Sequence, residues 1–162
     1  MQAFTTDRLS IKDWTPHLGD KGRRSSLEAS LAGILTPEVL RHLPPPLKLS
    51  GAGSVSAWVE ARAQESDVYL IQRTSDESLL GLLILASFDG EPPTIHIGYL
   101  LAEPAWGQGF ASELIKGLVR AVPRPARLLA GVEADNPASA RVLEKAGFRQ
   151  PSSGDLFELT VD

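Results

Sequence analysis

The order of helix-like and strand-like segments constrains the fold of this chain more than any other sequence feature. In the middle of the chain, β-rich stretches follow one another with turns of four and five residues, which predicts an antiparallel meander. Beyond residue 102 helical periodicity alternates with strand-like stretches. A helix that joins two strands of one sheet requires parallel pairing, so a mixed sheet is expected. The meander strands are predicted at 68–74, 79–88 and 94–102, followed by a helix at 108–121, a strand at 126–134, a helix at 136–147 and a strand at 155–161.

The region before the meander is predicted to add a strand at 8–14 and three helices. Ser25 and Glu28 have the spacing of a capping box, which places a helix start at Ser25. Thr36 followed by Pro37 marks the start of a short second helix, and residues 54–66 have the pattern of a third. We interpret the basic run 21–24 as a solvated turn.

These segments together predict one α/β (α+β) domain over residues 1–162. Its central sheet is expected to be mixed but mostly antiparallel, with six or seven strands flanked by about four helices. Trp14, Trp58 and Tyr99 are candidates to line a pocket, although packing in the core is the more common use of such side chains.

Composition excludes several functional classes. The chain has no cysteine, which rules out disulfides, thiolate metal sites and a cysteine nucleophile. A net charge of −4 without a long basic run argues against a nucleic-acid partner. No apolar run approaches the roughly 20 residues of a membrane helix. The first ten residues lack the apolar core of a secretory signal, so a cytoplasmic protein is expected.

The stretch EPAWGQGFASEL, at 103–114, places Gly107 and Gly109 directly before an amphipathic helix. The first N–H groups of a helix have no internal partner and carry the positive end of the helix dipole. Glycines at this point allow a phosphate to reach those groups, so the stretch is a candidate anion site. The alternative interpretation is that the two glycines only make a tight turn.

Three kinds of phosphate loop fit a strand, two glycines and a helix. A P-loop is rejected because no lysine precedes Ser112. A dinucleotide loop fits better, since Glu133 follows at the distance of a ribose-binding acid. However, its third glycine position is Ser112, and too little chain is left for a second set of parallel strands. A nucleotide-binding oxidoreductase fragment therefore stays as a lesser alternative.

The third kind carries a family resemblance. The stretch WGQGFASEL at 106–114 and the stretch DNPASARVLEKAGF at 135–148 resemble, in order and spacing, the two signatures of the GNAT superfamily of N-acetyltransferases. The stretches IGYLL and RLSIKDW resemble the branch of the ribosomal-protein alanine N-acetyltransferases. One departure is Trp106, at a position where the superfamily often has glutamine or arginine.

The resemblance implies a GNAT fold and the transfer of an acetyl group from acetyl-CoA to a primary amine. It places pantetheine, and an N–H donor for the thioester oxygen, on the strand that precedes the loop. The pyrophosphate would lie on the loop, while Asn136 and Ser139 would contact the pantetheine arm and the thiol end. The implied coenzyme-binding residues are Leu100, Leu101, Ala102, Trp106, Gly107, Gln108, Gly109, Phe110, Ala111, Ser112, Asn136 and Ser139.

The catalytic residues are less clearly marked. Many members of the family have a tyrosine at the position of Leu143, and here Ser139 is the candidate to protonate the leaving thiolate. His96 stands where members often have glutamate before the IGY stretch, so it is the first candidate for the general base. Glu133 is a lesser one. No His, Asp or Glu cluster has metal-ligand spacing in the sequence, so no metal is predicted.

The sequence therefore predicts an acetyl-CoA-dependent N-acetyltransferase that acts on a protein N-terminus or on a small amine. A non-catalytic acyl-CoA-binding module is the main alternative, because the family tyrosine is missing at Leu143. The acceptor is not identified by any residue set, and a homodimer stays open.

Overall fold

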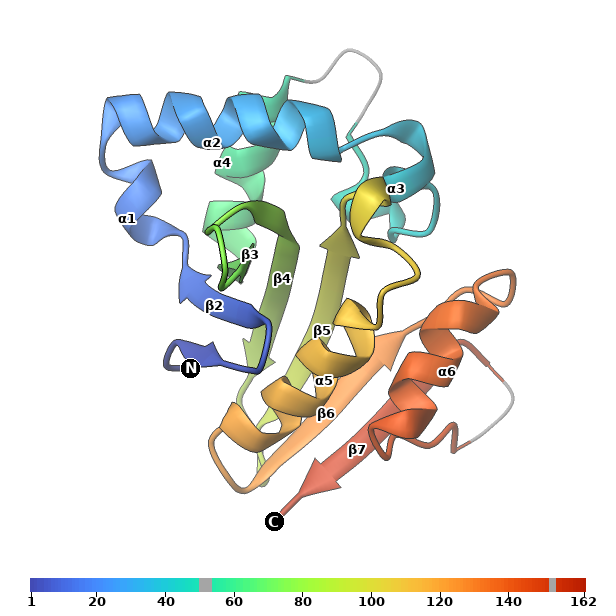
Figure 1. Cartoon of the computed structure of the whole chain (residues 1–162). Helices are drawn as coiled ribbons and strands as arrows, with labels where there is room; N and C mark the ends of the chain where they lie inside the picture. The colour runs from blue at the N-terminus through green and yellow to red at the C-terminus, as the bar shows by residue number, and fades with distance from the viewer. Residues whose placement is uncertain (50–53, 152–153) are drawn as a thin grey trace.

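The computed structural model describes residues 1–49, 54–151 and 154–162. It contains six α-helices and seven strands in this part of the chain (Figure 1). The elements are β1 Phe4–Thr5, β2 Leu9–Asp13, α1 Thr15–Leu18, α2 Lys21–Ile34, α3 Pro37–Arg41, η1 Pro45–Leu47, α4 Val55–Glu65, β3 Asp67–Arg73, β4 Leu79–Phe88, β5 Thr94–Leu101, η2 Glu103–Ala105, α5 Phe110–Ala121, β6 Ala126–Gly131, α6 Pro137–Lys145 and β7 Leu156–Val161.

The strands form one sheet in which neighbours in space are also neighbours in sequence, in the order β1 to β7. All pairs are antiparallel except β5 and β6, which are parallel because α5 carries the chain back between them. The predicted meander, the helical crossover and the mixed sheet are confirmed. Strand β1 was not predicted, because two residues are too short to show a period.

Two apolar layers cover the two faces of this sheet. One layer packs the buried side chains of α5 and α6 against Ile95, Ile97 and Leu101 of β5. The other packs those of α2, α3 and α4 against the opposite face, where Leu100 of β5 lies. Successive residues of a strand point to opposite faces, so β5 contributes side chains to both layers. Residues of β5 can therefore contribute to a site on either face of the sheet.

Helix α2 starts earlier than the sequence predicts. Helix α2 begins at Lys21, because the Asp20 carboxylate accepts the Arg23 amide at 2.8 Å and so caps the helix. The expected start at Ser25 is wrong, and Glu28 pairs instead with Arg24 at 3.0 Å. The run 21–24 is accordingly the first turn of a helix and not a separate turn.

The helix starts predicted at Thr36 and Asn136 are confirmed. The Thr36 hydroxyl accepts the Val39 amide at 3.3 Å, and the Asn136 side chain accepts the Ser139 amide at 3.3 Å. Trp14 and Trp58 are buried in the core, as the packing interpretation expected. No helix in the described ranges has both the length and the apolar character needed to cross a membrane.

Candidate functional site

The ladder between β5 and β6 stops partway along β5. It runs from Thr94 opposite Arg127 to Ile97 opposite Ala130, whereas β4 stays paired with β5 as far as Leu101. The last four residues of β5 therefore have no backbone partner on β6. The sheet is split at this point, and Figure 1 shows the two strands diverging toward α6.

The split leaves specific backbone groups available. The Ala102 amide donates to the Leu80 carbonyl at 2.7 Å, so alternate residues before it, such as Leu100, also direct their backbone toward β4. Tyr99 and Leu101 direct theirs toward the gap. The Leu101 carbonyl accepts the Trp106 indole N–H at 2.8 Å, so this carbonyl already has a partner. The amide of Leu101 is the group that remains for a ligand. Of the three residues predicted on this strand, Leu101 is the one whose amide points into the gap.

The backbone conformation of the glycine loop explains why glycine stands at two of its positions. Gly107 and Gly109 have φ values of +72° and +81°, which other residues rarely adopt. A Cβ at Gly107 would meet nothing within 4 Å, so crowding does not explain this glycine. Both glycines therefore form a tight turn. The same turn leaves the start of α5 without a side-chain cap.

Several amides at the start of α5 are available to an anion. The first hydrogen bond of the helix runs from the Glu113 amide to the Gly109 carbonyl at 3.1 Å. The amides of Phe110, Ala111 and Ser112 precede this bond, so they have no partner within the helix. They are the groups that the sequence assigned to a pyrophosphate, and the helix dipole favours negative charge beside them.

Arg8, at the end of the turn between β1 and β2, holds the glycine loop in place through three contacts. Its guanidinium donates to the Gln108 carbonyl at 2.9 Å and to the Glu113 carboxylate at 2.7 Å, and it lies over the Phe110 ring at 4.3 Å. The C=O and N–H of a trans peptide point in opposite directions, so this contact turns the Gly109 amide away from Arg8.

The Glu113 carboxylate fixes Arg8 in this position. Its carboxylate also accepts the Arg8 amide at 2.7 Å and the Thr6 hydroxyl at 2.5 Å. Partial burial alone raises the pKa of Glu113, but these hydrogen bonds and the Arg8 charge outweigh burial, so the pKa is lowered. Glu113 therefore stays ionised and fixes Arg8 behind the loop.

A second connection joins β5 to α6. The Tyr99 hydroxyl and Ser139 Oγ lie 2.8 Å apart, and either can be the donor. Burial raises the pKa of the Tyr99 phenol, and the hydrogen bond to Ser139 offsets part of this rise. The phenol therefore remains protonated at neutral pH. Ser139 is placed here because Asn136 caps its helix one turn earlier.

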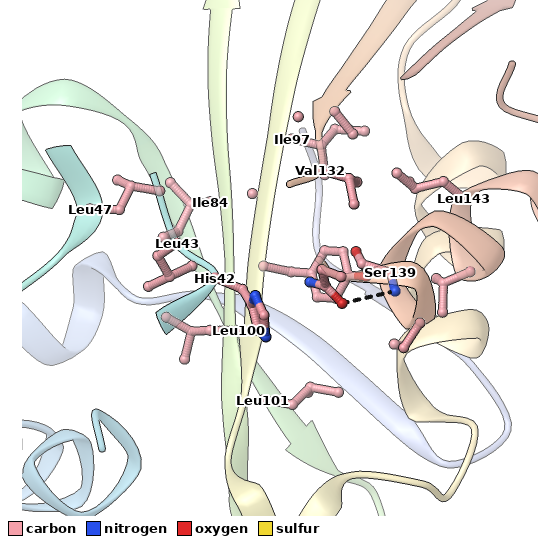
Figure 2. A pocket seen from close by; sticks show the side chains of 18 of the residues that line it. His42, Leu43, Leu47, Ile84, Ile97, Leu100, Leu101, Val132, Ser139 and Leu143 are labelled. Atoms are coloured by element: carbon pink, nitrogen blue, oxygen red, sulfur yellow. Dashed lines mark hydrogen bonds between the residues drawn. The ribbon is translucent and has the colours of Figure 1, made fainter. Parts of the chain in front are cut away.

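These groups surround a cavity of about 770 Å³ that reaches both faces of β5. Figure 2 shows Leu43, Leu47 and Ile84 on one side of the β5 ribbon and Val132, Ser139 and Leu143 on the other. We call the α5/α6 side the coenzyme lobe, after the coenzyme that the sequence resemblance implies for its residues. It is lined by Tyr99, Leu101, Trp106, Gly107, Gly109, Phe110, Ala111, Ser112, Asn136, Ser139 and Leu143. We call the other side the acceptor lobe, after the amine that the same resemblance implies. It is lined by Glu38, Val39, His42, Leu43, Leu47, Ile84, Ala86, His96, Gly98 and Leu100.

The structure separates the catalytic candidates. Ser139 lies in the coenzyme lobe, while His96 lines the acceptor lobe, where its ring meets Phe88 edge-on with 5.0 Å between centroids. Glu133 is not among the residues that line the cavity. Its carboxylate lies instead in a group with His42 and Asp135, whose candidate ligand atoms are within 4.8 Å of one another.

That group forms through tertiary contact, so sequence spacing did not reveal it. The same Asp135 carboxylate lies 3.6 Å from His42 Nδ1 and 3.9 Å from an Arg41 nitrogen. The guanidinium thus supplies positive charge at this point. The contacts link the end of α3 to the loop before α6 at the edge of the cavity.

Sequence reasoning missed Arg8, Glu113 and His42, and it did not connect Tyr99 with Ser139. Glu113 had a usable signal, because it lies in the first turn of α5 within the glycine stretch. Arg8 and His42 had none, since each acts through residues far away in the chain. The pairing of Tyr99 with Ser139 likewise depends on where α6 packs.

A split mixed sheet with a glycine turn at the helix beside the split defines the GNAT fold. The family model of the acetyltransferase (GNAT) domain matches residues 23–149, and the chain belongs to that family. No curated protein matches the sequence.

Three solved structures share the whole fold. RimL, a ribosomal L7/L12 alpha-N-protein acetyltransferase in complex with coenzyme A, is 18% identical, with a TM-score of 0.71 over 99% of both chains. The ribosomal-protein-S5-alanine acetyltransferase of Vibrio fischeri is 16% identical, with a TM-score of 0.71 over 100% of this chain and 98% of that one. Spermidine N-acetyltransferase of Vibrio cholerae, in complex with CoA and spermine, is 13% identical, with a TM-score of 0.69 over 94% and 95%. At these identities the likeness concerns the fold.

Proposed function

We propose that this protein is an acetyl-CoA-dependent N-acetyltransferase that transfers acetyl to a primary amine by direct attack. The observation that carries the proposal is the single cavity on both faces of β5, with backbone donors on one face and room for an acceptor on the other. A direct transfer needs both reactants at one point, and the split beside Tyr99 and Leu101 provides that point.

The coenzyme lobe fits coenzyme A by its own geometry. Amides at 110–112 and the turned amide of Gly109 offer donors to a pyrophosphate, while the unpaired edge of β5 offers donors and acceptors to the amides of pantetheine. Acetyl-CoA supplies an activated acetyl thioester when it is bound. The Leu101 amide is the proposed donor to the thioester oxygen, a role that needs a fixed N–H group.

Proton transfers are assigned to the two lobes separately. An amine must be neutral to attack, and His96 in the acceptor lobe is the proposed base. The leaving group is the thiolate of coenzyme A. The corresponding thiol has an ordinary pKa of about 8.5, so the thiolate needs only weak assistance from a proton donor. Ser139, hydrogen-bonded to the protonated Tyr99, is the proposed donor to it. Glu133, outside the cavity lining, is the lesser base candidate.

The non-catalytic alternative rested on the missing tyrosine. Leu143 is a fully buried residue of the core on the α5/α6 side of the sheet, and as a leucine it supplies no hydroxyl at this position of α6. Tyr99 brings a phenol to Ser139 from β5 instead. The dinucleotide alternative requires several parallel strands, whereas the described sheet has one parallel pair.

The test is thiol release from acetyl-CoA with a panel of alanine-initiated peptides, amino acids, spermidine and 2-phenylethylamine. We expect turnover with at least one amine and a decrease of about 10²-fold in kcat for His96→Ala. His17→Ala, a substitution in α1 away from the cavity lining, is the matched control and should leave kcat unchanged.

Two results would contradict the proposal. Tight acetyl-CoA binding without thiol release for any amine would favour a binding module. Tight NADH binding without acetyl-CoA binding would favour the nucleotide-binding alternative. An unchanged pH–rate profile in His96→Ala would remove this residue from the proton transfer.

A further inference from the structure

The acceptor lobe has an apolar wall. Val39 and Leu43 come from the α3 region, Ile84 and Leu100 come from the sheet, and all four line the cavity. Leu47 of η1 completes this wall (Figure 2). These side chains surround the space next to Gly98, the residue of β5 that faces Leu47 of η1 beside the split. An occupant of this lobe would therefore contact hydrocarbon along most of its length.

Charged partners are scarce on the same surface. Among the described residues that line the cavity, Glu38 is the one carboxylate, and it lies 4.0 Å from Arg41 at an exposed position. The other titratable side chains on this surface are the imidazoles of half-buried His42 and exposed His96. A charge placed among apolar side chains without a partner is strongly unfavourable. The lobe suits one amine, which loses its proton on reaction. To further ammonium groups its described lining offers the one carboxylate of Glu38, which already has Arg41 beside it.

We propose that the acceptor is a primary amine on an apolar body, such as an aralkyl or branched alkyl amine, and not a polyamine. This inference rests on the proposed function and names its substrate class. The apolar body would lie against Val39, Leu43 and Leu47. Its amine would point through the split toward Leu101, with His96 on the same face of β5. Glu133 and Asp135 lie near the cavity edge but outside the residues that line it, and an Arg41 nitrogen lies 3.9 Å from the Asp135 carboxylate.

Gly98 makes the size of the lobe testable. A Cβ at this position would lie 3.6 Å from Leu47 Cδ1 and 3.9 Å from Ile84 Cβ, which are ordinary contacts. Alanine is therefore accommodated, and the two further methyl groups of valine would enter the space meant for the acceptor. The side chain points away from the coenzyme lobe because neighbouring residues of β5 alternate between faces.

The experiment measures binding of 2-phenylethylamine and of spermidine to the CoA-loaded protein by calorimetry, so it does not depend on turnover. We expect 2-phenylethylamine to bind at least about tenfold more tightly than spermidine, and Gly98→Val to weaken it by about tenfold or more. The affinity for CoA itself should stay within a factor of about two, because the coenzyme lobe is untouched.

Adding a negative charge to the lobe tests the same inference, because it should favour a polyamine. Leu47→Glu adds a carboxylate to the partly exposed edge of the wall and should move the preference toward spermidine by about tenfold. Leu49→Glu is the matched control, since Leu49 is also half-buried but does not line the cavity. Circular dichroism checks that each variant is folded, and Gly98→Ala serves as a milder variant if Gly98→Val is not.

Three outcomes would overturn this inference. They are equal or tighter binding of spermidine to the unaltered protein, the same preference in Leu47→Glu, and unchanged 2-phenylethylamine binding in the folded Gly98 variants. None of them contradicts acetyl transfer as such. Failure of the proposed function is recognised separately, as the absence of thiol release with every amine.

Discussion

The Tyr99 hydroxyl lies 2.8 Å from Ser139 Oγ, and this hydrogen bond connects β5 to α6 across the split in the sheet. Its two partners come from different parts of the coenzyme lobe. Burial keeps the phenol protonated, and the serine can take a proton from it while giving one away. The pair thus places a hydroxyl donor in a chain that has leucine at the position of the family tyrosine.

Removal of either hydroxyl is expected to slow the reaction. Tyr99→Phe and Ser139→Ala should each lower kcat by about tenfold or more, and the double variant should lose less than the product of the two, because they act as one donor. Steady-state kinetics with saturating acetyl-CoA measures this. Full multiplicativity of the two losses would show that the hydroxyls act independently, and unchanged kcat in both would remove the donor role.

The raised pKa of Tyr99 sets a pH expectation. A phenol whose pKa lies above its ordinary value of 10.0 stays a donor throughout the neutral and mildly alkaline range. The kcat profile should therefore show no loss from this group below about pH 10. A loss near pH 8 that disappears in Tyr99→Phe would show that the phenol ionises earlier than its burial implies.

The glycine turn gives a prediction about coenzyme affinity. Gly109→Glu adds a negative charge to the glycine loop and a side chain at a φ of +81°, whose Cβ would lie 3.5 Å from a nitrogen of Arg8, the residue that holds the loop. We expect acetyl-CoA binding to weaken by more than about 100-fold, with an additional stability loss of about 1–3 kcal/mol from the strained backbone. Gly109→Asn is the matched control, since asparagine tolerates this conformation without the charge. Undiminished affinity in a folded Gly109→Glu protein would refute the loop assignment.

Arg8 should affect the affinity for acetyl-CoA indirectly, because it holds the glycine loop. Arg8→Met keeps apolar packing on Phe110 but removes the hydrogen bond to the Gln108 carbonyl. Because the loop peptide is then free to turn, we expect the Kd for acetyl-CoA to rise about tenfold. Arg127→Met is the control, as Arg127 pairs with Glu158 at 2.6 Å on β6 and β7 with similar exposure, away from the loop. Equal effects of both variants would contradict a specific role for Arg8.

Glu113 predicts a pH dependence of stability. Its folded-state pKa is lowered, so its contribution is fully present above the ordinary value of 4.5 and is lost as pH falls through the lowered pKa. Glu113→Gln should therefore be less stable than the unaltered protein at neutral pH, and the difference should shrink in acid. Urea unfolding at neutral pH and well below pH 4.5 measures this. A difference that is independent of pH would assign the effect to shape and not to charge.

The sequence by itself determined the architecture. The short turns of the meander, the helical crossover and the caps at Thr36 and Asn136 depend on neighbours within a few residues, so local pattern predicts them. The glycine turn is also local, because φ values at Gly107 and Gly109 are set by the chain around them. The false helix start at Ser25 shows the limit, since Asp20 offered an earlier cap in the same stretch.

The tertiary structure decided how the site is assembled. The end of the β5–β6 ladder, the contact of Tyr99 with Ser139 and the position of Arg8 behind the loop each join segments that are distant in the chain. Spacing in sequence carries no information about such contacts, because they depend on how α5 and α6 pack on the sheet. Hydrogen bonding with β4 likewise selects Leu101 over Leu100 and Ala102, since it fixes which amides of β5 remain for a ligand.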